Sequence, residues 1–424
     1  MKRFTFLIMA ALMLLGLSSC QKKYVASVTD LRLVRVDPSS GYEGDLIHIL
    51  GRNFSTAFGE NHVYINGVEA KMVEFNKDQL TIVAPPNELG TYSVEVETPL
   101  GRVSREDLTF TYKKKPAKLY MVTTIAGNGS NTLKDEIGTN AAIGRIEGLA
   151  WAPDKSAIWF CQRSAGYAVR TFNLSTQMVK SVVTGIPLPW GGDFDAAGDF
   201  YFPGKDAKKV FKIAKGGSSA EEVTLPAAVE LNAPMYVKFD SKGNMWIASR
   251  GNHTVYKVKD GALIKAFTGE KYFPVALAVD SKDRVFFAST QDRGIFMIDG
   301  DAVTKVAGTG TVPTKDDYEI SLASGPAGTN IGNIGGLYIT PDGTLYYTDN
   351  MTFTVMKIVP DAGGSYTSGK IAIVAGLPFS AAVVNGTTDK AQFKYPSGIV
   401  VSDDGKRIYV SEPTSFVLRM IDLS

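Results

Sequence analysis

The sequence predicts an all-β protein in which a small β-sandwich is followed by a six-bladed β-propeller. One phrase repeats six times between Gly148 and Ile421, and its clearest copy spans Met235–Val258. That copy consists of an apolar strand, a tight turn, a second strand, a polar loop and an alternating third strand. Periodic β units of this kind indicate a radial propeller in which each repeat forms one blade. Glycine, at 42 of 424 residues, suits a chain with many turns.

The blades can be counted from the residue at the head of each turn between the first two strands. These residues are Ala152, Asp195, Asp240, Asp280, Thr340 and Ser402. The last two spacings are longer than the others, which predicts insertions at 309–334 and 377–397. The phrase that ends several outer strands, Ala-Gly, also closes segment 121–126 before any full blade. We therefore expect 121–126 to complete the sixth blade and to close a ring that spans 121–424.

Residues 29–112 are expected to form a separate first domain of short strands with Gly and Pro punctuation, which is typical of an antiparallel β-sandwich. The segment carries a Pro38-x-x-Gly41 opening, a Gly51-x-x-Phe54 hook and a late Pro85-Pro86 pair. These motifs resemble the IPT/TIG immunoglobulin-like domain. The resemblance implies a spacer or an interaction module. A basic, Pro-containing linker is expected at 113–120.

The second part of the chain resembles NHL-repeat propellers. The matching segments are Gly251–Val258, Tyr346–Asn350 and Tyr395–Val401, together with the outer strands that end in Ala-Gly. The resemblance implies the fold and leaves the function open, because the same ring carries enzymes, scaffolds and binding proteins.

The N-terminus has the pattern of a targeting segment. Lys2 and Arg3 precede an apolar run, Phe4–Leu17, that is short for a membrane span, which needs about 20 residues. The run ends in Leu-Ser-Ser-Cys, which resembles a bacterial lipobox. We expect a signal peptide at 1–19, lipidation of Cys20 and a short tether at 20–28. Lipidation would anchor the protein to a membrane, and the outer membrane is the expected one, at its cell-surface or periplasmic face.

Charge and cysteine content narrow the classes of function. Removal of 1–19 takes Lys2 and Arg3 from the 45 basic residues and leaves 43, which balance the 43 acidic ones. A mature protein of about zero net charge is not expected to bind nucleic acid, which requires a concentrated basic face. With Cys20 lipidated, Cys161 stands alone, and an intramolecular disulfide is excluded.

Two sets of loops are expected to share one face of the ring. One set joins each outer strand to the next inner strand, and the other follows the second strand of each blade. Loops clustered on one face of a rigid scaffold are where binding usually occurs. Aromatic faces and planar amides in these loops suit sugars. The candidate ligand-binding residues are Arg145, Glu147, Arg163, Trp190, Arg250, Asn252, Gln291, Arg293, Asp349, Asn350, Tyr395 and Glu412.

Lipobox, IPT/TIG spacer and NHL propeller together look like lipoproteins of Gram-negative gut bacteria that are associated with polysaccharide capture. The sequence therefore favours an envelope-anchored binding module over an enzyme, with a glycan as the leading ligand. A docking platform for an envelope protein is the alternative, and a metal-dependent lactonase or hydrolase is the third hypothesis. His253 is the one histidine of the propeller, so a multi-histidine zinc site is excluded there.

No cofactor is expected, although an oxygen-ligand calcium site remains open. Its candidate ligands are Glu147, Asn252, Asp349, Asn350 and Glu412.

Overall fold

The computed structural model describes residues 30–113 and 120–424. Contacts divide the chain into two compact units, Met1–Lys118 and Leu119–Ser424. The expected signal peptide, the expected lipidation site at Cys20, the expected tether and most of the expected linker lie outside the described residues. Within the described ranges, none of the helices has both the length and the hydropathy of a membrane span.

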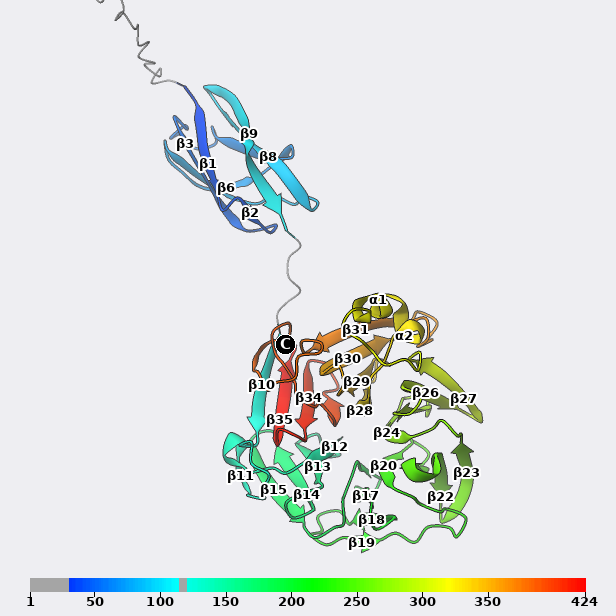
Figure 1. Cartoon of the computed structure of the whole chain (residues 1–424). Coiled ribbons are helices and arrows are strands. Elements are labelled where there is room, and N and C mark those ends of the chain that lie inside the picture. The colour runs from blue at the N-terminus through cyan, green and yellow to red at the C-terminus, as the bar shows by residue number, and fades with distance from the viewer. Residues whose placement is uncertain (1–29, 114–119) are drawn as a thin grey trace, which may run out of the picture. The chain divides into compact units, whose positions relative to one another are not determined.

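The first unit is a β-sandwich of two sheets (Figure 1). One sheet has the order β1 (Arg32–Asp37), β3 (Leu46–Arg52), β7 (Gln79–Val83), β6 (Lys71–Phe75). The other has the order β2 (Ser40–Gly41), β9 (Gly101–Tyr112), β8 (Gly90–Thr98), β4 (His62–Ile65), β5 (Val68–Glu69). Buried and accessible residues alternate along β3, as expected for a strand with one face in a core. That core includes Ile47, Val94 and Phe110.

The second unit is a six-bladed propeller, as predicted: residues 120–424 form six sheets around a centre (Figure 1). Blade 1 contains β12 (Ile146–Trp151), β13 (Ala157–Gln162), β14 (Ala168–Asn173), β15 (Met178–Val183) and, outermost, β11 (Glu136–Ile137), which a 3-10 turn, η1 (Gly138–Asn140), follows. Blade 2 contains β16 (Asp193–Phe194), β17 (Phe200–Gly204), β18 (Lys209–Ile213) and β19 (Glu221–Glu222). Blade 3 contains β20 (Pro234–Phe239), β21 (Met245–Ser249), β22 (Thr254–Lys259) and β23 (Ala262–Thr268), with η2 (Arg250–Asn252) after β21.

The remaining blades follow the same order from the centre outwards. Blade 4 contains β24 (Pro274–Val279), β25 (Val285–Ser289), β26 (Gly294–Asp299) and β27 (Ala302–Ala307). Blade 5 contains β28 (Ile334–Ile339), β29 (Leu345–Asp349), β30 (Thr354–Val359) and β31 (Lys370–Ala375). Blade 6 contains β33 (Ile399–Val401), β34 (Arg407–Glu412), β35 (Val417–Asp422), β10 (Met121–Ala126) and β32 (Gly386–Thr387).

The ring closes between the two ends of the propeller sequence. Strand β10 pairs antiparallel with β35, and Val122 lies opposite Ile421. The expectation that segment 121–126 completes the sixth blade is therefore confirmed. Val122 and Ile421 are both fully buried in the core of this blade.

The turn between the first two strands of a blade is closed by its head residue. The amide of Asp240 donates to the Asn244 carbonyl over 3.1 Å, and its carboxylate accepts from the amides of Lys242 and Asn244. Asp280 closes the turn of blade 4 in the same way. This side-chain capping explains why aspartate recurs at the head of the repeat.

Glycines let the innermost strands of neighbouring blades approach one another. A Cβ on Gly148 would overlap the Cα of Gly191, and one on Gly191 would overlap the Tyr236 ring. Gly335 is similarly close to the backbone of Ser397. The inner strands therefore pack backbone to backbone, which only residues without a side chain permit.

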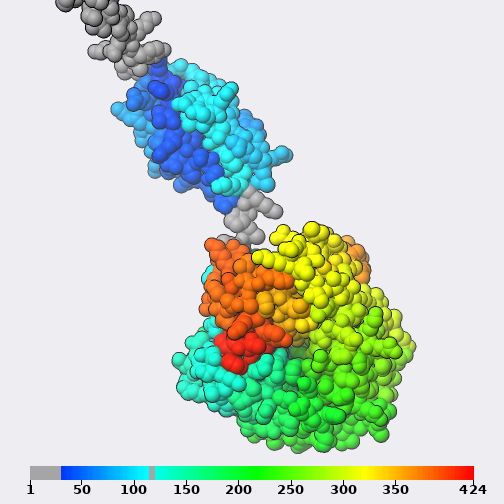
Figure 2. All heavy atoms as spheres, viewed as in Figure 1, coloured from blue at the N-terminus to red at the C-terminus, as the bar shows by residue number. Residues whose placement is uncertain are grey.

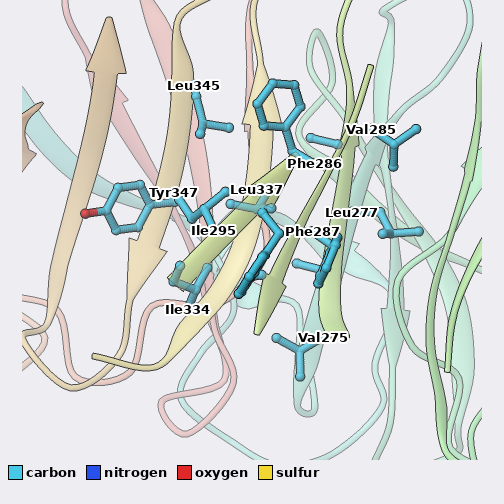
Figure 3. Packing of buried hydrophobic residues seen from close by; sticks show 14 of the residues in the cluster. Val275, Leu277, Val285, Phe286, Phe287, Ile295, Ile334, Leu337, Leu345 and Tyr347 are labelled. Carbon is cyan, nitrogen blue, oxygen red and sulfur yellow. The ribbon is translucent and has the colours of Figure 1, made fainter. Parts of the chain in front are cut away.

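Apolar side chains fill the space between the sheets. Figure 3 shows this core in blades 4 and 5, where Phe286 and Phe287 of β25 lie near Leu337 and Tyr347 of β28 and β29. The Phe287 ring also packs against Phe296 at 5.0 Å between centroids. This packing makes the blades a rigid frame for the loops at their ends.

The two insertions lie between blades 4 and 5 and between blades 5 and 6. The first contains α1 (Tyr318–Ala323) and α2 (Gly325–Gly328), and the second contributes β32 to the edge of blade 6. They meet where the Tyr318 and Phe379 rings pack edge to face at 5.4 Å. Figure 2 shows them side by side, in yellow and orange.

We predict that Val122→Asp opens the ring, because it places a carboxylate in the apolar core that Val122 and Ile421 share with residues of blade 5. The free energy of unfolding of the propeller should fall by about 3 kcal/mol or more. Met121→Asp is the matched control, since Met121 is exposed on the same strand. Thermal and denaturant unfolding would measure both, and equal stabilities would contradict the role assigned to β10.

Candidate functional site

All six blades of the propeller contribute to one cavity of about 580 Å³. Its residues come from the two expected loop sets, which meet at one face: the starts of innermost strands and the positions just after second strands. They are Glu147, Arg163, Trp190, Lys205, Met235, Arg250, Phe273, Val275, Thr290, Gln291, Asn333, Ile334, Gly335, Asn350, Tyr395 and Ser397. Seven of the twelve candidate residues thus lie together: Glu147, Arg163, Trp190, Arg250, Gln291, Asn350 and Tyr395.

Five polar side chains reach the cavity from the loops that follow the second strands of successive blades. They follow β13, β17, β21, β25 and β29, and they are Arg163, Lys205, Arg250, Gln291 and Asn350. Three basic residues on blades 1 to 3 are thus followed by two amides on blades 4 and 5. The cavity has a basic side and a neutral, amide-bearing side.

Trp190 is held rigidly at the edge of blade 2. Its backbone amide donates to the Pro203 carbonyl over 3.1 Å, and the adjacent Gly191 amide donates to the Met235 carbonyl over 3.0 Å. The indole is half-buried and packs in part on the core of the ring. The Arg163 guanidinium lies 4.8 Å from the ring centroid and the Lys205 ammonium 5.4 Å, which are cation–π distances.

The one carboxylate among the cavity-lining residues is neutralised by its neighbours. Arg163 donates from Nε to Oε1 of Glu147, and the Ser397 hydroxyl donates to Oε2 over 2.9 Å. Glu147 is only 5% exposed. Both carboxylate oxygens are therefore engaged, and Glu147 fixes the orientation of Arg163 across the cavity wall.

Two further arginines, Arg250 and Arg145, form no ion pair with a carboxylate of residues 30–113 or 120–424. The Arg250 guanidinium lies 5.3 Å from the Phe273 ring, and its Nε is buried without a hydrogen-bond partner among the described residues. Arg145 does not line the cavity, but its buried Nε also lacks a partner in that part of the chain. Burial and the Glu147 charge raise the pKa of Tyr395, while Arg163 and Arg145 lower it. The Arg145 carbonyl accepts from the amide of Arg163 over 2.8 Å, so Arg145 adjoins a residue that lines the cavity.

Asp349 and Glu412, both candidate ligand residues, do not line the cavity. Asp349 accepts from the Gly332 amide over 2.7 Å and from Met351, and burial raises its pKa. Glu412 is fully buried and pairs with Arg419 at 2.5 Å. Each is the last residue of a second strand, and successive strand residues point in opposite directions. Asn350, one position later than Asp349, lines the cavity instead.

Asn252 and Arg293 also lie outside the cavity lining. The Asn252 amide donates to the Tyr256 hydroxyl over 2.8 Å and thereby fixes the loop after β21. Arg293 donates to Asn333 over 3.2 Å, so it borders the site through a residue that lines it.

The sequence did not single out a repeated anchor behind these loops. Arg170 on β14 and Arg419 on β35 are fully buried at equivalent places in blades 1 and 6. Arg170 donates to the carbonyls of Ala142 and Lys134, and Arg419 donates to those of Gln392 and Val384. The signal that could have identified these arginines is their position, because each stands on a strand whose other buried positions are apolar.

The acidic candidate calcium ligands do not gather into one group. Over residues 30–113 and 120–424, no three histidine, cysteine or acidic side chains gather in a group that could hold a metal ion. Of the candidate calcium ligands, Asp349 is engaged by backbone amides and Glu412 by Arg419.

Comparison with known proteins supports both units. The IPT/TIG domain model matches residues 31–112. An auxiliary nutrient binding protein from Bacteroides thetaiotaomicron has a similar structure, with 14% identity, a TM-score of 0.61, and coverage of 92% of this chain and 97% of that chain. Another from Bacteroides ovatus is 16% identical, with a TM-score of 0.59 and coverage of 92% and 97%. At these identities the likeness concerns the fold alone. The comparison with curated proteins finds no match.

We predict that Glu412→Ala destabilises the propeller by about 3–5 kcal/mol, because it leaves the buried Arg419 guanidinium without its carboxylate. Asn350→Ala is the comparison, since Asn350 comes one residue after Asp349, the residue of blade 5 that is equivalent to Glu412. It should change the free energy of unfolding by less than about 1 kcal/mol. Denaturant unfolding of both variants tests the assignment. Comparable losses would show that Glu412 has no special structural role.

Proposed function

We propose that the protein is an envelope-anchored binding module whose propeller cavity takes a glycan. The observation that carries this proposal is the cavity itself, where an aromatic ring, planar amides and basic groups from all six blades meet. A hydrolase would need convergent carboxylates or a metal cluster. The cavity offers Glu147 alone, and both of its oxygens are engaged.

The lining matches the physical requirements of sugar recognition. Sugars present apolar C–H faces that pack on aromatic rings, and hydroxyl groups that bond to amides and charged groups. Trp190 supplies the ring, while Gln291 and Asn350 supply amides on the opposite blades. A cavity of about 580 Å³ lies within the range of small-ligand sites and has room for a few sugar units of a longer chain.

The comparisons support a binding role as well. Two structures of similar fold, each matched over 92% of this chain, are auxiliary nutrient binding proteins of Bacteroides species. We also propose that the propeller is an NHL-type ring, on the repeats at Gly251–Val258 and Tyr346–Asn350.

We further propose that Cys20 is lipidated and anchors the protein to the outer membrane, at its cell-surface or periplasmic face. The support is the Leu-Ser-Ser-Cys ending of the apolar N-terminal run. The IPT/TIG unit would then act as a spacer between the anchor and the propeller.

Docking of an envelope protein is a second candidate, and the insertions favour it. They carry exposed apolar side chains, with Ile320 on α1 73% exposed and Leu377 42% exposed. These segments adjoin one another through Tyr318 and Phe379. Apolar residues gathered on adjoining loops are typical of protein contacts.

We predict that Trp190→Ala weakens polysaccharide binding by roughly thirtyfold or more, the loss expected for a tryptophan at the centre of a contact. The fold should persist, because the indole is only half-buried. Trp151→Ala is the control, because Trp151 is a tryptophan that does not line the cavity. It ends β12, the innermost strand that carries Glu147, and its indole donates to the Val401 carbonyl.

Affinity electrophoresis against plant, host and microbial polysaccharides would identify a ligand, and titration would then compare the variants. Unchanged affinity of Trp190→Ala would remove the ring from the binding surface. If no polysaccharide binds the unaltered protein, the glycan proposal fails and the docking role becomes the leading one.

A further inference from the structure

We infer that the cavity selects an acidic glycan, one that carries carboxylate or sulfate groups, and that Arg250 and Lys205 bind the acidic group. This inference rests on the proposed glycan-binding function and narrows it to a ligand class. It follows from the balance, pairing and placement of charges in the cavity.

The cavity is positively charged in a protein that is nearly neutral. Its lining holds Arg163, Lys205 and Arg250 against Glu147, so three positive side chains and one negative one leave a net charge of +2. The whole chain has the same formal charge of +2, spread over 424 residues. A local excess of one sign inside a concave wall raises the concentration of counter-charged ligands there.

The three basic residues of the cavity differ in whether they form an ion pair. Arg163 is matched by Glu147, as described above. Arg250 and Lys205 have no ion pair within the residues that the structure describes, and each lies against an aromatic ring, Phe273 and Trp190 respectively. Their charges are therefore available to a ligand.

Nearby carboxylates do not compensate them. Asp206 and Glu230 are exposed and do not line the cavity. Asp292 pairs with Lys305 at 3.2 Å. Arg250 has a buried Nε without a hydrogen-bond partner among the described residues, and an unpaired buried donor is costly until a ligand satisfies it.

Placement gives the ligand an orientation. Lys205 and Arg250 stand on the adjacent blades 2 and 3, whereas Gln291 and Asn350 stand on blades 4 and 5. An acidic group would bind on the basic side, and neutral hydroxyls would bond to the amides across the cavity. The planar guanidinium fork of Arg250 matches the paired oxygens of a carboxylate or a sulfate.

The test uses the detergent-solubilised full chain and two matched pairs of polysaccharides, polygalacturonate with its methyl ester and dextran sulfate with dextran. We expect at least one acidic member to bind roughly tenfold or more tightly than its neutral partner, and less tightly as sodium chloride is raised. The pair that shows this difference identifies carboxylate or sulfate as the recognised group.

Variants then assign the residues. Arg250→Gln and Lys205→Gln should each weaken binding of the acidic ligand roughly tenfold, and Arg250→Lys should retain part of the affinity. Lys208→Gln is the control, because Lys208 is exposed near Lys205 and lies outside the cavity. Thermal unfolding of every variant separates lost binding from lost fold.

The outcomes separate this inference from the proposed function. Equal affinity for acidic and neutral members, or unchanged affinity in both glutamine variants, would overturn the acidic-ligand inference and leave glycan binding intact. Failure of all four polysaccharides, together with failure of the broader panel, would overturn both.

Discussion

Pairing between β10 and β35 is the constraint on which the propeller depends. It joins the first strand of the ring to the last, with Val122 opposite Ile421 in a buried core. Without it, blade 6 would lack its outer strand and expose an edge, and blades 1 and 6 would not be held side by side. The cavity needs that closure because Glu147 of blade 1 bonds to Ser397, which precedes the inner strand of blade 6.

Closure alone does not make a site; the inner strands must also come close. Gly148, Gly191 and Gly335 remove the side chains that would keep neighbouring backbones apart. The side chains that remain at the strand ends, such as Trp190 and Tyr395, then converge on a single cavity. Glycine placement in the repeats is thus a requirement of binding geometry as well as of turns.

Buried arginines hold the long loops that border this frame. Arg170 and Arg419 bond to loop carbonyls in blades 1 and 6 and pair with Asp135 and Glu412 respectively. A buried charge with several hydrogen bonds tolerates little displacement. The acidic residues of these pairs therefore serve the scaffold, while the unpaired basic residues, Arg250 and Lys205, remain for a ligand.

The sequence by itself determined the order of domains, the number of blades, the closing strand and the face that carries the site, because each follows from a periodic pattern or a turn signal. It also identified Trp190, Arg163 and Arg250 among the residues that line the cavity. Only the tertiary structure decided between neighbours such as Asp349 and Asn350, since one residue of register turns a strand side chain from solvent to core. Charge pairing was likewise decided there, because the partners of Glu147 and Glu412 come together through folding and not through proximity in the chain alone.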